Sequence, residues 1–197
     1  MAWPLSATAT FGSAPLWYLT RSTGLVAFVL LTVATCFGVA ATQRALASPA
    51  WPRFATQTLH RNVSLLGMAL LLVHIVTTIL DTYVNVGWLS FVVPGTSHYR
   101  TPWVALGTIG FDLLLLVSLT SLARLRMPGR LWRTVHWSTY VAWPITLVHF
   151  LKTGTDTGVW GLGLGLASAA LVVAAAVLRL ATTDAPAPLR TIVRGRG

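Results

Sequence analysis

The sequence predicts an all-α integral membrane protein, a helical bundle of about five transmembrane helices. Hydrophobic residues make up 55% of the chain and charged residues only 9%, whereas a soluble domain carries about a quarter charged residues. Apolar segments close to the length that a helix needs to cross hydrocarbon lie at about 23–41, 62–80, 103–123, 134–151 and 158–180. In a chain of 197 residues these segments leave no room for a second globular domain.

The two ends of the chain differ in composition from this apolar middle. Residues 1–20 are rich in Ala, Ser and Thr and contain two prolines, and they are expected to form an N-terminal leader outside the membrane. Residues 21–181 are expected to form the transmembrane bundle. Residues 182–197 contain two prolines and three arginines, and they predict a basic cytoplasmic tail without regular structure.

The arginines predict how the bundle is oriented in the membrane. They collect in the first and third connections between apolar segments and in the C-terminal tail, whereas each of the other two connections carries one basic and one acidic residue. By the positive-inside rule the N-terminus lies outside and the C-terminus inside. Topology and contact with anionic membrane lipid therefore account for the net charge of +10, and nucleic acid is not an expected partner.

Four of the five histidines form two pairs on the second and fourth apolar segments. His60 and His74 lie fourteen residues apart, so on a helix they share a face to within roughly 40° and are separated by about 21 Å along the axis. His136 and His149 lie thirteen residues apart, which leaves an ideal helix roughly 140° from a shared face. Pro144 lies between them and is expected to kink this helix and re-aim one ring.

Pairing across the bundle predicts two metal sites at different depths. The second and fourth segments run in the same direction, which sets His60 opposite His136 near the inner surface and His74 opposite His149 in the outer half. A six-coordinate haem takes one imidazole on each face of its iron, and ligation offsets the cost of a polar ring in lipid. Gly67, midway between His60 and His74 on their face, is expected to let a flat macrocycle approach.

Of two other interpretations of the histidines, a structural role stays open and zinc binding is disfavoured. Membrane histidines also form polar contacts between helices, and a non-redox membrane protein would use them in that structural role. Zinc is disfavoured because pairs about 21 Å apart cannot combine into one tetrahedral site. The single cysteine, Cys36, excludes an internal disulfide and a cysteine-ligated iron–sulfur cluster.

The histidine spacings resemble those of the ferric reductase-like transmembrane domain. This superfamily includes ferric reductases, NADPH oxidases and the haem subunit of the bacterial periplasmic methionine sulfoxide reductase system. The resemblance covers roughly Trp17 to Leu180, and three short segments are similar to those of small bacterial members: Arg21-Ser-Thr-Gly24, Leu59-His-Arg-Asn62 and Ser97-His-Tyr-Arg-Thr-Pro-Trp103.

The resemblance implies two stacked b haems in a bacterial cytoplasmic membrane protein. It assigns His60 and His136 to the inner haem iron, and His74 and His149 to the outer. Ferric reductases and NADPH oxidases also carry a further N-terminal span and a cytosolic flavin and nicotinamide domain, which this sequence does not show. The chain is therefore expected to be an oxidoreductase haem subunit, and its electron donor a separate flavin/nicotinamide reductase or a quinol.

Several other residues are candidates for supporting roles. Haem propionates prefer arginine partners, so Arg21 and Arg100 are candidates at the outer haem and Arg61 and Arg133 at the inner one. Interfacial snorkelling toward lipid phosphate explains each arginine equally well.

Asp112 is the single carboxylate deep inside a predicted span, where it is expected to have either a redox-linked role or an interhelical partner. His98 and Tyr99 lie in an outer loop, where they contact an acceptor or are only a polar loop.

The sequence thus predicts transmembrane electron transfer from a cytoplasmic donor to an extracytoplasmic acceptor through two b haems. The acceptor is expected to be an extracytoplasmic flavoprotein or a small molecule. The alternatives are a quinol-linked b-type cytochrome subunit and a non-redox membrane protein with structural histidines.

Overall fold

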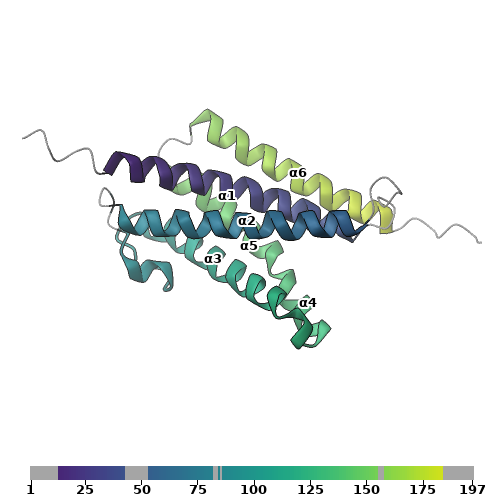
Figure 1. Ribbon diagram of the computed structural model, residues 1–197. Coiled ribbons are helices and arrows are strands. Elements are labelled where there is room, and N and C mark those ends of the chain that lie inside the picture. The colour runs from purple at the N-terminus through teal and green to yellow at the C-terminus, as the bar shows by residue number, and fades with distance from the viewer. Residues whose placement is uncertain (1–12, 43–52, 82–83, 85, 155–157, 184–197) are drawn as a thin grey trace, which may run out of the picture.

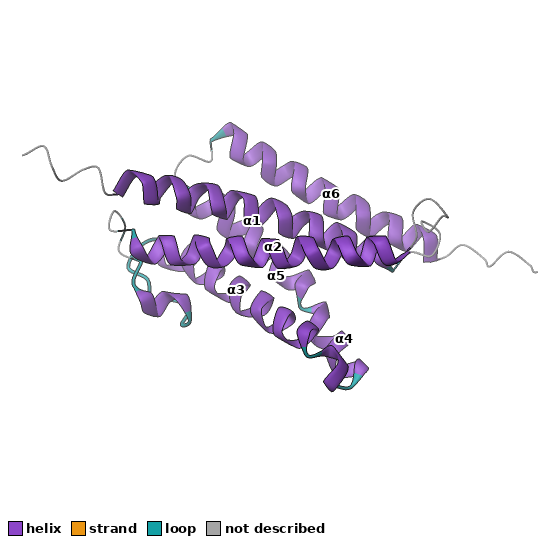
Figure 2. Ribbon diagram, in the orientation of Figure 1, coloured by secondary structure: helices purple, strands orange, loops and turns teal. Residues whose placement is uncertain are grey.

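The computed structural model describes residues 13–42, 53–81, 84, 86–154 and 158–183, and these residues form helices and loops without a strand (Figures 1 and 2). Four of the helices are long and apolar enough to cross a membrane. The predicted all-α membrane bundle is confirmed. In chain order the elements are α1 (Ser13–Ala41), α2 (Arg53–Leu80), η1 (Trp88–Phe91), α3 (Thr101–Leu122), η2 (Arg124–Arg126), α4 (Gly129–Trp137), α5 (Thr139–Thr153) and α6 (Val159–Thr183).

Helix α1 lies at the centre of the bundle. Figure 1 shows α2 along one side of α1 and α6 along another. Helix α3 packs chiefly on α5, and α5 also contacts α1 and α6. Helices α2 and α5 run in the same direction as each other and opposite to α1 and α3 (Figure 1). The two histidine-bearing segments are therefore co-directional.

The fourth apolar segment is broken into two helices. Helix α4 ends at Trp137 and α5 begins at Thr139, with Ser138 between them. The hydroxyl of Ser138 donates to the carbonyl of Val135 at 2.7 Å, and that of Thr139 donates to the carbonyl of His136 at 2.8 Å. These side chains add hydrogen bonds to the carbonyls at the end of α4, which also accept from the backbone N–H of Ser138.

The interruption does not fall where the sequence predicts it. Pro144 lies inside α5, and the break is at Ser138, between His136 and Pro144. Proline cannot donate a hydrogen bond to the carbonyl four residues earlier, which weakens the turn before it. The hydroxyls of Ser138 and Thr139 supply additional hydrogen bonds before that weakened stretch, and the regular helix is interrupted there.

Helix boundaries extend beyond the apolar segments. Helix α1 begins at Ser13, inside the predicted leader, and α2 begins at Arg53, nine residues before the predicted span. A helix continues through polar turns at the membrane surface, so hydropathy marks the crossing and not the helix end. Helix α6 continues to Thr183, two residues into the predicted tail, and residues 1–12 and 184–197 lie outside the described part of the chain.

Glycine lets neighbouring helices approach closely. A Cβ at Gly67 would lie 3.4 Å from Leu31 Cδ2, and one at Gly165 would lie 2.9 Å from Leu151 Cδ2. Gly67 is buried against α1, so the expectation that it makes room for a macrocycle is wrong. Its missing side chain serves helix packing, as small residues do in membrane bundles.

One buried polar contact joins α1 to α5. The indole Nε1 of Trp143 donates to Thr32 Oγ1 at 3.0 Å. The Trp143 ring also stacks on Phe28, with centroids 6.3 Å apart. Membrane interiors offer no water to replace such a bond, so it fixes how α5 sits on α1.

Candidate functional site

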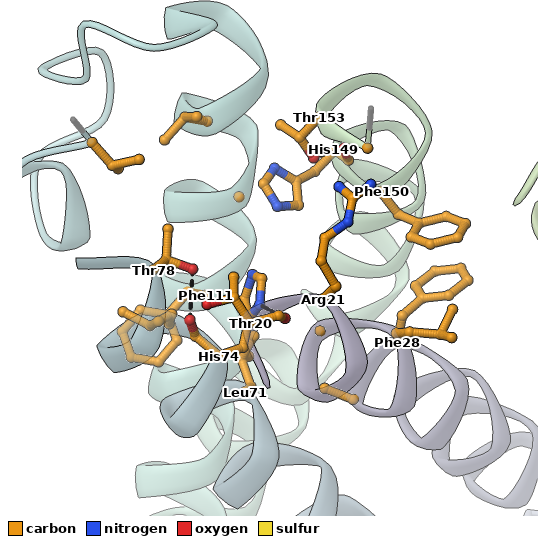
Figure 3. A pocket seen from close by; sticks show the side chains of 18 of the residues that line it. Thr20, Arg21, Phe28, Leu71, His74, Thr78, Phe111, His149, Phe150 and Thr153 are labelled. Atoms are coloured by element: carbon orange, nitrogen blue, oxygen red, sulfur yellow. Dashed lines mark hydrogen bonds between the residues drawn. The ribbon is translucent and has the colours of Figure 1, made fainter. Parts of the chain in front are cut away.

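His74 and His149 line one cavity. It has a volume of about 510 Å³ and lies among α1, α2, α3 and α5, within the size range of cofactor pockets. Figure 3 shows both rings directed into this space, from α2 and α5 respectively. Its walls are mostly apolar and include Phe28, Leu71, Phe111 and Phe150. The structure therefore brings the predicted outer pair together around a space large enough for a cofactor.

Three histidine rings share one hydrogen-bond arrangement. The Nδ1 atom of His60 lies 2.8 Å from the carbonyl oxygen of Ala34, and that of His74 lies 2.8 Å from the carbonyl oxygen of Thr20. The Nδ1 atom of His149 lies 2.7 Å from the carbonyl oxygen of Trp103. A carbonyl oxygen only accepts, so Nδ1 carries the proton and Nε2 keeps its lone pair. Each ring is thereby set to bind a metal through Nε2.

Each of these three rings rests on a glycine. The glycine lies four residues after the accepting carbonyl, at Gly38 for His60, at Gly24 for His74 and at Gly107 for His149. A Cβ would meet the nearest ring atom at 3.1 Å, 2.6 Å and 2.5 Å respectively. Real Cβ atoms do not approach so closely at the last two positions, so only glycine fits there without a shift.

The glycines were missed in the sequence, although a signal was present. Gly24 and Gly38 on α1 are fourteen residues apart, the same spacing as His60 and His74 on α2. Because α1 and α2 are antiparallel neighbours, the two spacings place each ring on its glycine. A matched spacing of glycine and histidine on adjacent helices is thus the pattern that predicts this arrangement.

His60 and His136 face each other at the other end of the bundle. Their ring centroids lie 6.1 Å apart and the ring planes are at 77°. Two imidazole nitrogens each about 2 Å from one metal ion would give a centroid separation of roughly 6 Å. The separation fits a single metal bound between the two rings. Among the described residues no group of three or more His, Cys, Asp or Glu side chains forms a metal cluster.

Arg21 and Tyr99 also line the outer cavity. In Figure 3 the Arg21 side chain extends from α1 toward the space that holds His149. Its guanidinium carbon lies 5.2 Å from the Trp17 ring centroid. A cation at this position suits an anionic group at the edge of a bound cofactor.

The other predicted residues lie away from the cavity lining. Arg100 donates from Nη1 to the carbonyl of Lys152 at 2.7 Å, which ties the loop before α3 to the end of α5. His98 is exposed in that loop. Asp112 is partly exposed on α3, and no hydrogen bond or ion pair holds its carboxylate among the described residues. Their placement assigns them no contact with the cavity.

Arg61 and Arg133 lie near the inner histidines in sequence. Arg61 follows His60 on α2, and Arg133 precedes His136 by less than one turn on α4. Both side chains are exposed. They are placed at the surface near the inner pair, where snorkelling toward lipid phosphate is equally compatible.

Comparison with known proteins identifies a family but no individual relative. Residues 23–147, more than half of the chain, match the family described as ferric reductase like transmembrane component. The matched region contains His60, His74 and His136 and ends two residues before His149. No curated protein and no solved structure matches. The chain therefore belongs to the ferric reductase-like transmembrane family, as its histidine spacings predict.

Proposed function

We propose that this protein carries electrons across a membrane through two b haems. His60 and His136 would bind the inner iron, and His74 and His149 the outer iron. The observation that carries the proposal is the pairing of imidazoles at two levels of one bundle, with Nδ1 within hydrogen-bond distance of a backbone carbonyl in three of the four rings. Family membership supports transmembrane electron transfer in general.

The haem, when bound, supplies the one-electron chemistry, and the protein sets how it is held. Hydrogen bonds from Nδ1 to backbone carbonyls raise the basicity of the ligand nitrogen, which favours ferric iron. Apolar walls around the outer site, such as Phe28 and Phe111, exclude water from it. Arg21 would pair with an outer propionate, and Arg61 and Arg133 with an inner one.

The direction of transfer follows from the proposed orientation. The exposed arginines between α3 and α4 mark that end of the bundle as cytoplasmic by the positive-inside rule. The His60–His136 site lies toward this end and would receive electrons from a separate flavin/nicotinamide reductase or a quinol. The His74–His149 site would deliver them to an extracytoplasmic flavoprotein or a small molecule.

Counting haems in the purified protein tests the proposal. We expect a pyridine haemochrome assay to give about two b haems per chain, and His74→Ala and His149→Ala each to remove about one. His98→Ala is the matched control, because His98 is exposed outside the cavity lining, and it should retain both. A colourless preparation would refute the proposal. Full haem content in His74→Ala would refute the pairing.

A further inference from the structure

His136 is held differently from the other three site histidines. Its Nδ1 atom is buried and has no hydrogen-bond partner among the described residues. None of the described glycines on a neighbouring helix has a His136 ring atom among its nearest contacts. On α3, the position thirteen residues after Gly107, which would match the spacing of the histidines on α4 and α5, is Thr120. The arrangement of carbonyl and glycine that fixes the other rings is therefore missing here.

The Trp132 indole contacts the His136 ring in place of a carbonyl and a glycine. One turn earlier on α4, its indole stacks on the His136 ring with centroids 5.1 Å apart and planes at 26°. The indole is itself held from α3 and η2. Its Nε1 donates to Ser121 Oγ at 3.4 Å, and the Arg124 guanidinium carbon lies 5.0 Å from its ring centroid.

The inference rests on the proposed haem function. We propose that Trp132 is the positioning residue for His136, and that its indole face replaces the backbone hydrogen bond in aiming this imidazole at the inner iron. The His136 ring also lies near His60, with ring centroids 6.1 Å apart and ring planes at 77°. Stacking restricts rotation of the ring about its side-chain bonds before any metal binds. A freely rotating imidazole would instead lose that conformational entropy on binding the iron.

The position of α4 makes this contact decisive. Helix α4 has nine residues and places His136 in its last turn, where the Trp132 indole stacks on the ring. Without the indole, the His136 ring loses its stacking partner, and its Nδ1 atom has no hydrogen bond among the described residues to hold the ligand orientation. The inner haem would then remain on His60 while its bond to His136 Nε2 is exchangeable. Carbon monoxide would replace that nitrogen: the iron–nitrogen bond breaks, an iron–carbon bond forms, and no electron is transferred.

Carbon monoxide binding to the dithionite-reduced, purified holoprotein tests the proposal. In the original protein two imidazoles would hold each iron, so the protein should bind little of the gas. Trp132→Leu should bind about one carbon monoxide per chain, a rise of roughly tenfold, because only the inner site opens. Trp132→Phe keeps an aromatic face and should restore low binding. Trp137→Leu is the control, since Trp137 is on the same helix with 59% of its surface exposed.

The possible outcomes distinguish failure of the Trp132 positioning role from failure of the proposed haem function. If the original protein holds no haem, the proposed function fails. If the original protein and Trp132→Leu both hold two haems and Trp132→Leu binds no more gas than the original protein, only the positioning role fails. Equal gas binding by Trp132→Phe and Trp132→Leu, or loss of the inner haem from both, also overturns the role of stacking. Loss of the inner haem from Trp132→Leu but not from Trp132→Phe supports it.

Discussion

Backbone atoms, rather than other side chains, orient three of the four imidazoles. The carbonyls of Thr20, Ala34 and Trp103 accept the Nδ1 hydrogen bonds. Substitution cannot delete a carbonyl, so point changes at these three residues would leave the acceptor in place. The adjacent glycines are the positions at which the sequence can disturb the arrangement, because any Cβ there displaces the ring.

Gly107→Ala should therefore damage the outer site. The added methyl group would lie 2.5 Å from His149 Cε1, and the ring must move off its carbonyl partner. We expect a loss of about half of the bound haem and a destabilisation of roughly 1–3 kcal/mol from overpacking. Both are measured on purified protein, by haem count and by thermal unfolding followed in the Soret band.

Gly163→Ala provides the matched control for this change. Gly163 lies on α6, and a Cβ there meets nothing within 4 Å. In a helix the alanine should be neutral or slightly stabilising. Unchanged haem content in Gly107→Ala would show that His149 is not confined as the contact implies.

Helix α1 organises the site although it contains no histidine. It supplies the carbonyl and glycine contacts for both His60 and His74, and its Thr32 accepts the indole hydrogen bond from α5. One helix thus contacts two imidazoles on α2 and is hydrogen-bonded to α5. Packing on α1 should govern haem affinity at both levels.

Thr32→Val should weaken the contact between α1 and α5. The valine keeps the shape and leaves the Trp143 Nε1–H buried without its acceptor, at a cost of about 1 kcal/mol. Thermal unfolding in detergent measures the change. Combination with Trp143→Phe should show the non-additivity of a direct contact.

Thr35→Val is the control for the loss of a threonine hydroxyl in α1. The Thr35 hydroxyl donates to the carbonyl of Leu31 within its own helix and joins no other helix. Its removal should be nearly neutral. A Thr32→Val protein as stable as Thr35→Val would mean that the bond to Trp143 contributes nothing.

The break between α4 and α5 explains how thirteen residues can separate two ligands. On one continuous helix His136 and His149 would point in directions roughly 140° apart. The interruption at Ser138 divides this segment into two helices, and each of them places its own ring near a histidine of α2.

The whole molecule should cross the membrane with its N-terminus outside. The loop holding His98 would then be extracytoplasmic, and η2 with Arg126 cytoplasmic. In a Cys36→Ser background, a membrane-impermeant maleimide added to intact cells should label His98→Cys but not Arg126→Cys. Both positions are exposed, so accessibility in the protein is matched. Permeabilised cells should show labelling of both, and the reverse pattern in intact cells would invert the proposed direction of electron flow.

The sequence alone determined the membrane-bundle class and the family, because apolar segment length and histidine spacing are local properties of the chain. It also predicted which histidines lie near each other, because the second and fourth segments of a bundle of successive crossings run in the same direction. The helix ends, the break at Ser138 and the true role of Gly67 required the structure, because each depends on which neighbour packs against the residue. The glycines that contact His60, His74 and His149, and the His136 Nδ1 atom without a hydrogen-bond partner among the described residues, could not be predicted for the same reason. These features arise only when residues distant in sequence come into contact, and the tertiary structure decides those contacts.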